Sequence, residues 1–148
     1  MENLLWRIIF AFFLAYLSQV MTESVTSDML LNYEDIVRLT GEKSIILIDV
    51  RQPHELQETG VLPTSINIPL NNLKTALESL SSEEFQKKYG IPLPDKNAPL
   101  VFTCRSGNRS MKALLTALEL GFKDAKHYAG GYLDWEKNKG LSEKKEKH

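Results

Sequence analysis

Two short runs of apolar and β-branched residues, at residues 44–50 and 100–103, constrain the fold of this chain more than any other feature. Such runs are typical of strands buried on both faces, because neither side of the strand can then be polar. Two further short strands are predicted at residues 65–68 and 125–128. Helical patterns separate the strands, and this alternation predicts an α/β domain with a mainly parallel, doubly wound sheet of about five strands.

The helices are predicted from apolar spacing and end signals. In residues 110–120, Met111, Leu114 and Leu118 recur on one helical face, and Gly121 supplies a C-terminal stop. Ser81 and Glu84 have the spacing of a capping box, which predicts a helix start. The predicted helices cover residues 32–39, 71–80, 81–89, 110–120 and 131–137.

Length and charge narrow the functional classes. The chain has 148 residues, which fits one domain, and a formal net charge of -1. Such a balance gives no general attraction to nucleic acid or to anionic membranes, so we expect no nucleic-acid partner. There is one cysteine, which excludes an intramolecular disulfide and a cysteine-based zinc site. We expect no metal and no cofactor.

The first 21 residues differ from the rest of the chain. An uninterrupted apolar run covers residues 8–17, within a longer apolar segment at 4–17. Its length matches the apolar part of a signal peptide, although its flanking residues match poorly. Residues 1–21 are therefore interpreted as a possible signal or anchor, with a dispensable extension as the alternative. A membrane partner is expected only if this segment is retained.

The remaining chain is divided into a globular domain at residues 29–140 and a charged tail at 141–148. A glycosylation sequon at 108–110 falls in the loop after the third predicted strand, where a glycan would block any site. For that reason we favour a cytoplasmic or mitochondrial soluble domain over a secreted one.

The loop after the strand at 100–103 carries the strongest functional signal. Cys104 lies at the carboxyl end of this strand, where ligands bind in open α/β sheets. A helix follows within a few residues, and Gly107 allows the tight turn that this requires. Main-chain N–H groups of such a loop converge into an anion-binding nest, to which Arg105 and Arg109 add positive charge.

This setting predicts a reactive thiol. An ordinary cysteine has a pKa of about 8.5 and is only about 3% thiolate at neutral pH. Helix N-termini and neighbouring arginines lower that pKa, so Cys104 is predicted to be a nucleophile. Because the chain has no second cysteine, any persulfide on Cys104 cannot be attacked by another cysteine of the same chain.

Three motifs in order resemble the rhodanese (thiosulfate sulfurtransferase-like) family, including its single-domain, heat-shock-associated insect members. The loop 104–110, CRSGNRS, is similar to the family's active-site loop, with four residues between the cysteine and the arginine. Residues 47–51, with Glu55 and the following segment to Pro69, resemble its N-terminal signature. Residues 121–131 with Trp135 resemble its C-terminal signature. The resemblance covers residues 29–140.

The resemblance implies a rhodanese-like domain and a two-step sulfur transfer through a persulfide on Cys104. The donor is expected to be a small sulfur anion such as thiosulfate, and the acceptor a thiol of glutathione, thioredoxin or another protein, or cyanide. The predicted substrate-binding residues are Arg105, Ser106, Gly107, Asn108 and Arg109. The predicted supporting residues are Asp49, Arg51 and Ser110.

Two alternatives are kept. A phosphatase or arsenate reductase of similar fold has a loop one residue longer than this one, which disfavours that class. A non-catalytic binding or stress-signalling module is the second alternative, although relatives of that kind usually lack the cysteine. Of the other candidate side chains, His54 and His127 are expected at the surface, and Tyr128 and Trp135 in the core.

Overall fold

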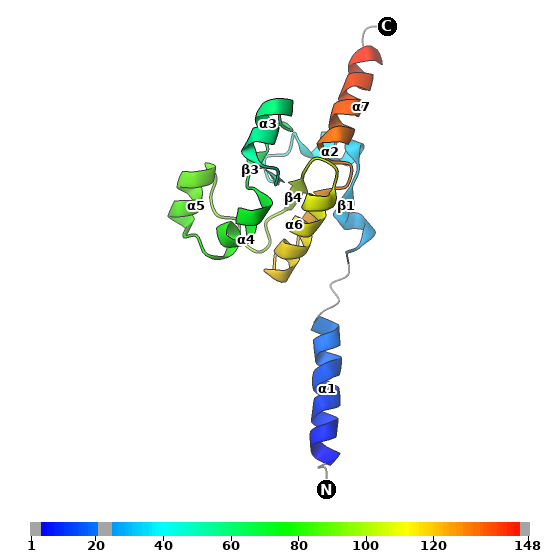
Figure 1. Ribbon diagram of the computed structural model, residues 1–148, viewed down its shortest axis with the longest axis vertical. Helices are drawn as coiled ribbons and strands as arrows, with labels where there is room; N and C mark the ends of the chain where they lie inside the picture. Colours follow the sequence, from blue (N-terminus) through cyan, green and yellow to red (C-terminus); the bar gives the residue numbers. More distant parts are fainter. Residues whose placement is uncertain (1–3, 21–24, 146–148) are drawn as a thin grey trace.

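A computed structural model describes residues 4–20 and 25–145 of the chain (Figure 1). Its centre is a five-stranded sheet in which every pair of neighbouring strands is parallel. In spatial order the strands are β1 (Leu30–Leu31), β5 (Ala125–Tyr128), β4 (Leu100–Thr103), β2 (Ile46–Asp49) and β3 (Ile66–Asn67). The predicted α/β fold with about five strands is confirmed.

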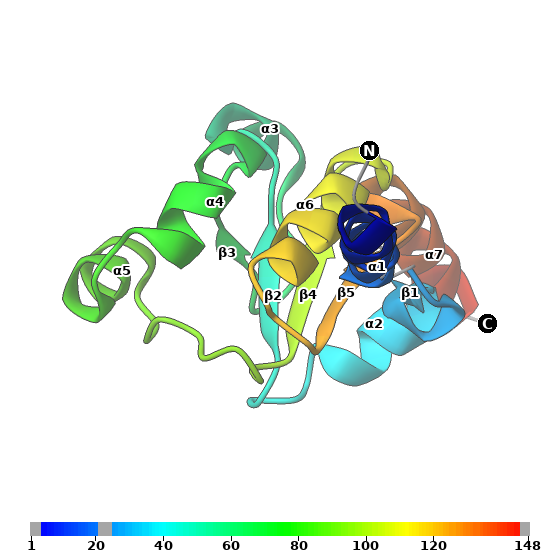
Figure 2. The same ribbon diagram turned by 90° about the horizontal axis from the view of Figure 1, so that it is seen from below.

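Helices cover both faces of the sheet (Figure 2). Helices α4 (Leu70–Glu78), α5 (Ser82–Tyr89) and α6 (Asn108–Glu119) pack on one face. Helices α2 (Tyr33–Leu39) and α7 (Gly131–Lys145) contact each other on the opposite face. The sheet is therefore the middle of three layers.

Successive residues of the central strands enter different apolar clusters. Ile48 and Phe102 belong to the cluster under α4, α5 and α6, whereas Leu47 and Val101 belong to the cluster under α2 and α7. Side chains of a strand alternate between faces, so an apolar residue is needed at every position. This is the physical reason for the continuous apolar runs in the sequence.

The helix starts follow the sequence closely in two places. Asn32 caps α2 by accepting a hydrogen bond from the Asp35 amide, 3.0 Å. Ser81 and Glu84 form the predicted capping box at the start of α5. Helix α6 begins two residues before the predicted start, and α7 continues to Lys145, so part of the predicted charged tail is helical.

Three short elements have no counterpart in the sequence predictions. These are β1, a single 3₁₀ turn at Ser27–Met29, and helix α3 (Pro53–Thr59). Helix α3 contains no buried residue, so it lacks the apolar repeat by which helices are recognised. The local signs of its start are Pro53 in the first turn and Glu55, whose carboxylate accepts a hydrogen bond from the Gln52 amide at 2.9 Å.

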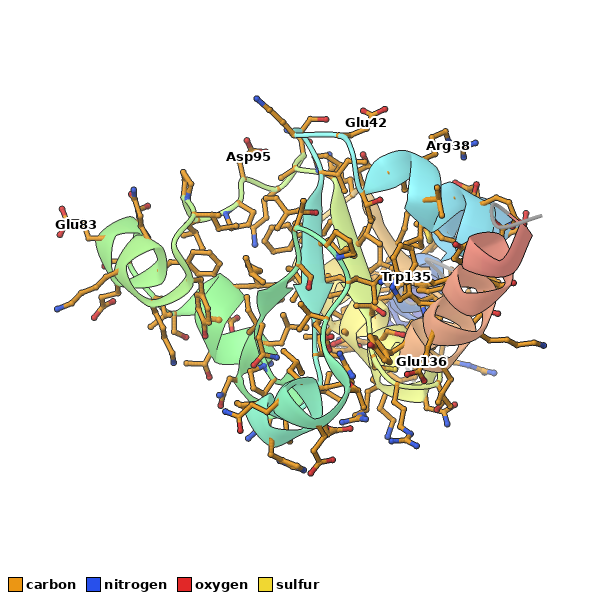
Figure 3. All side chains as sticks on the ribbon, turned by 90° about the horizontal axis from the view of Figure 1, so that it is seen from above. Arg38, Glu42, Glu83, Asp95, Trp135 and Glu136 are labelled. Carbon is orange, nitrogen blue, oxygen red and sulfur yellow. The ribbon has the colours of Figure 1, made fainter. Side chains whose placement is uncertain are left out.

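Of the side chains predicted in the core, Tyr128 is fully buried. Trp135 is half-buried against the second cluster, with its ring 5.5 Å from that of Tyr33. Charged side chains such as Arg38, Glu83 and Asp95 project from the outer surface (Figure 3). The partition into an apolar interior and a charged exterior is that of an ordinary globular domain.

The N-terminal helix α1 (Leu4–Val20) stands apart from the three layers (Figure 1). Its described large apolar side chains are exposed, Trp6 and Phe12 by about two thirds or more. At 1.5 Å per residue its 17 residues extend roughly 25 Å. No helix in the described ranges is long and apolar enough to cross a membrane. A signal or anchor role for residues 1–21 stays a prediction.

Candidate active site

Cys104 follows directly on β4, at the carboxyl edge of the sheet, and α6 begins four residues later. The turn between them depends on Gly107, which has a φ of 95°, in the left-handed region. A Cβ atom at this position would lie 2.2 Å from the carbonyl oxygen of Ala129. Only glycine fits both the backbone conformation and the space.

The sulfur of Cys104 is held by groups of its own loop. The Gly107 amide donates a hydrogen bond to Sγ at 3.1 Å, and the Ser110 Oγ lies 3.5 Å from Sγ. Burial raises the pKa of the thiol, since the side chain is 1% exposed. Hydrogen bonds from the Ser110 hydroxyl and from the amides of Ser110, Ser106 and Gly107 outweigh burial, and the net pKa is lowered.

Ser110 connects the sulfur to a buried histidine. Its Oγ lies 3.1 Å from the carbonyl oxygen of Gly107 and 3.0 Å from Nδ1 of His127 on β5. His127 is 3% exposed, so the expectation that it lies at the surface is wrong; the same expectation holds for His54, which is exposed. His127 shares a strand face with Ala125, which points into the core under α6.

Arg109 forms an ion pair with Glu55 of α3. Its two terminal nitrogens donate to the two carboxylate oxygens at 2.6 and 2.8 Å. The hydrogen bonds from Arg109 lower the pKa of Glu55 to about 2. Glu55 in turn raises the pKa of Arg109, which also interacts electrostatically with Cys104. The structure therefore neutralises one of the two positive charges that the sequence places around the sulfur.

A second ion pair, between Asp49 and Arg51, lies at the end of β2. Both side chains are almost completely buried, and the Arg51 Nη2 is 2.6 Å from the Asp49 carboxylate. The guanidinium also donates to the Thr59 hydroxyl and the Gly60 carbonyl, at 2.8 and 3.0 Å. It stacks on the ring of Tyr132, 4.5 Å from the ring centroid.

The start of α7 holds the loop from the other side. The amide of Tyr132 donates to the Cys104 carbonyl at 2.8 Å, and the amide of Leu133 donates to the Arg105 carbonyl at 3.1 Å. Gly131 makes this approach possible, because a Cβ there would lie 2.6 Å from the Arg105 oxygen. The predicted supporting pair reaches the loop through Tyr132, whose ring lies against Arg51.

The remaining predicted binding residues lie at the mouth of the loop. The side chains of Arg105, Ser106 and Asn108 are exposed. Within the described ranges, the Arg105 guanidinium makes no hydrogen bond or ion pair. The predicted loop residues thus lie around the Cys104 sulfur or at the mouth of the loop. Of the two loop arginines, Arg109 is paired with Glu55 and Arg105 has no ion pair in the described ranges.

The roles of two residues at the site were not predicted from the sequence: Glu55 as the partner of Arg109, and His127 as a buried partner of Ser110. Glu55 appeared only within a signature, and its pairing with Arg109 spans 54 positions. His127 could have been placed inward by the strand alternation that it shares with Ala125. No three His, Cys, Asp or Glu side chains of the described chain are grouped as a metal site requires.

A parallel α/β sheet that presents one cysteine to converging main-chain amides defines a class of domains with a cysteine-based anion-binding loop. The chain belongs to the rhodanese-like domain family, whose model matches residues 32–138.

Individual relatives agree with this assignment. The chain is 42% identical to the rhodanese domain-containing protein CG4456 of Drosophila melanogaster over 109 residues, 74% of this chain and 97% of that protein. It is 34% identical to the thiosulfate:glutathione sulfurtransferase of Saccharomyces cerevisiae, covering 77% of this chain and 82% of that one. The structure of the human single-domain sulfurtransferase TSTD1 is similar with a TM-score of 0.69 at 31% identity, covering 74% and 96% of the two chains. The chain is a rhodanese-domain relative of sulfurtransferases.

Proposed function

We propose that the protein transfers sulfane sulfur from an anionic donor such as thiosulfate to a thiol or cyanide, through a persulfide on Cys104. The observation that supports this most directly is the lowered pKa of the buried Cys104 sulfur. Its pKa is lowered although it is almost fully buried, because the loop amides and Ser110 are aimed at it. A buried sulfur with a lowered pKa and preorganised donors is suited to nucleophilic attack.

In the first half-reaction, the Cys104 thiolate attacks the outer sulfur of thiosulfate. A sulfur–sulfur bond forms to Cys104, the sulfur–sulfur bond of the donor breaks, and sulfite leaves with the electron pair. In the second, an acceptor thiolate attacks the outer sulfur of the persulfide. The acceptor becomes a persulfide and the Cys104 thiolate is regenerated; with cyanide as acceptor the product is thiocyanate.

The loop supplies the charge stabilisation that these steps need. Main-chain amides at Ser106, Gly107 and Ser110 stabilise the sulfur while it is anionic. Arg105, exposed and unpaired in the described structure, is placed to meet the oxyanions of the donor. Arg109 contributes its charge from within the pair with Glu55, and stabilises the persulfide and the departing anion.

The choice of substrates is supported by the names of relatives. Proteins of Saccharomyces cerevisiae and Homo sapiens, 34% and 37% identical to this chain, are thiosulfate:glutathione sulfurtransferases. We therefore propose thiosulfate as donor and glutathione as acceptor, with thioredoxin or a protein thiol as further acceptors to be compared.

Turnover of the wild type and of Cys104→Ser tests the proposal. We expect sulfite release from thiosulfate in the presence of glutathione or cyanide, and a loss of at least about 10³-fold in the variant. Wild-type protein treated with thiosulfate alone should gain the mass of one sulfur atom on Cys104. Glu58→Gln, at an exposed position outside the loop, serves as the control and should keep the turnover of the wild type. Equal turnover in wild type and Cys104→Ser contradicts the proposal.

A further inference from the structure

His127 is a buried imidazole that the proposed sulfur transfer does not use. It lies on β5, is 3% exposed, and contacts the site through one hydrogen bond, between Nδ1 and the Ser110 Oγ at 3.0 Å. Its other ring nitrogen, Nε2, is buried and has no hydrogen-bond partner in the described structure. A buried polar atom without a partner calls for an explanation, because it costs free energy to desolvate.

The hydrogen-bond inventory of Ser110 favours one of the two tautomers of His127, because the hydroxyl donates to the Gly107 carbonyl. The hydroxyl has one hydrogen and three polar neighbours: the Gly107 carbonyl oxygen, the Cys104 sulfur and His127 Nδ1. A carbonyl oxygen and a thiolate only accept hydrogen bonds. If the hydroxyl hydrogen goes to either of these, His127 has to donate, and the proton of its ring is on Nδ1.

This tautomer has a consequence for the sulfur. When Nδ1–H of His127 occupies a lone pair of the Ser110 oxygen, the hydroxyl hydrogen turns toward the Gly107 carbonyl or toward Cys104. Negative charge on the sulfur favours the second orientation, since hydrogen bonds to charged acceptors are the stronger ones. The opposite tautomer would leave a buried N–H without an acceptor at Nε2, and would draw the hydroxyl hydrogen away from the sulfur.

Burial also keeps the imidazole neutral, because it lowers the pKa of His127 below its ordinary value. A neutral ring orients the hydroxyl without adding a charge to the core. The charged group that acts on the sulfur lies on another element: it is Arg109 on α6, which is paired with Glu55 on α3.

We propose that His127 is a positioning residue for sulfur transfer: its Nδ1–H holds the Ser110 hydroxyl so that this hydroxyl donates to the Cys104 sulfur whenever the sulfur is anionic. This inference rests on the proposed function, because it concerns the anionic forms of Cys104 in the transfer cycle. His127 acts through Ser110 and does not touch the substrate.

The tautomer is tested first, on the unaltered protein. In a long-range ¹⁵N–¹H spectrum of the wild type at neutral pH, we expect Nδ1 of His127 to be protonated and Nε2 to be unprotonated. A ring protonated on Nε2, or on both nitrogens, overturns the proposal. This measurement does not depend on how any variant folds.

The effect on the sulfur is tested with two variants of His127, by titrating Cys104 through its ultraviolet thiolate absorbance. His127→Phe keeps a ring but removes the donor, and should raise the pKa of Cys104 by about one unit, a roughly tenfold loss of thiolate at a given pH. His127→Asn keeps an N–H close to the Nδ1 position and should shift that pKa by less than about 0.3 unit. Equal shifts in the two variants indicate a packing role only and overturn the proposal.

A double-mutant cycle with Ser110→Ala separates the proposed route from a general disturbance of the core. In the Ser110→Ala background, His127→Phe should cause no further rise in the pKa of Cys104, because the connecting hydroxyl is gone. A full additional shift overturns the proposal. His54→Asn, at an exposed histidine, is the control and should leave the titration unchanged.

These titrations also distinguish the two proposals. Absence of sulfur transfer in the wild type, with the titration results as expected, contradicts the proposed function and leaves the coupling of His127 to Cys104 established. Normal transfer in the wild type, with the same pKa of Cys104 in the wild type and all the variants, supports the proposed function and overturns the positioning role of His127.

Discussion

Two arginine–carboxylate pairs flank the cysteine loop, and they differ in their access to solvent. The side chains of Asp49 and Arg51 are 0% and 1% exposed, whereas those of Glu55 and Arg109 are 18% and 33% exposed. The inner pair is enclosed by hydrogen bonds to α3 and by the Tyr132 ring. The outer pair joins two helices beside the loop.

Similar chemistry serves different purposes at different depths of the molecule. A charge in the interior cannot lose its partner without a large desolvation cost, so the inner pair is suited to fixing structure. A partly exposed charge can exchange its partner for water or for an anion at lower cost. The outer pair is therefore the one that can take part in substrate binding.

The largest effect is expected for Arg51→Met, which leaves the Asp49 carboxylate buried and unpaired. The free energy of unfolding should fall by about 3–5 kcal/mol, measured by urea denaturation. Arg38→Met is the matched control: it breaks an exposed pair on α2, whose arginine points away from the sheet (Figure 3), and should cost less than about 0.5 kcal/mol.

Removing both charges of the inner pair tests whether the unpaired charge causes the loss of stability. Asp49→Leu combined with Arg51→Met should recover part of the lost stability, since no buried charge is left unpaired. If Arg51→Met costs no more than Arg38→Met, the inner pair is not the structural element described above.

Arg109→Met should produce the next largest effect, on activity. The loss of the cation beside Cys104 should lower kcat/KM for thiosulfate by about 10²-fold, whereas unfolding should change by only about 1 kcal/mol. Steady-state kinetics and denaturation of the same preparation provide both readouts. A large loss of stability with unchanged kinetics would show that the outer pair, like the inner pair, stabilises the fold and does not take part in substrate binding.

Glu55→Gln is expected to act in the other direction on binding. It removes the carboxylate that occupies Arg109, so the KM for thiosulfate should fall a few-fold while stability falls by about 1 kcal/mol. Glu58→Gln, at an exposed position on the same helix, is the control and should change neither quantity. An increased KM in Glu55→Gln would mean that the carboxylate orients Arg109 for the donor.

The smallest effect is a pH dependence of the outer pair. The pKa of Glu55 is lowered from 4.5 to about 2, so its contribution to stability is complete above pH 4.5 and is lost as the pH falls toward 2. The stability difference between wild type and Glu55→Gln should therefore shrink over this interval and stay constant at higher pH. Parallel denaturation midpoints throughout would show that the pair does not stabilise the fold.

The two pairs also show what the sequence could predict. Strands β2 and β4 were predictable because burial on both faces requires unbroken apolar runs, and the loop because Cys104, Gly107 and the following helix are contiguous. The inner pair is also local, with Asp49 and Arg51 two residues apart at a strand end.

What could not be predicted depends on contacts between distant segments. Nothing near Glu55 in the sequence indicates that its carboxylate meets Arg109 across 54 positions, so the sequence suggests a free charge where the structure has a neutralised one. Strand β1 has two residues and α3 has no buried face, so neither produces a periodic pattern. His127 is a different case, because it shares a strand face with Ala125 and this alternation could have placed it inward.

The contacts that α7 makes with the loop are main-chain hydrogen bonds, from Tyr132 and Leu133 to the carbonyls of Cys104 and Arg105. They do not depend on which side chains the loop carries at its exposed positions. Residues 105, 106 and 108 can therefore diverge during evolution with little penalty in folding. Under the proposed function, donor preference would change through these three positions while the geometry around the sulfur stays the same.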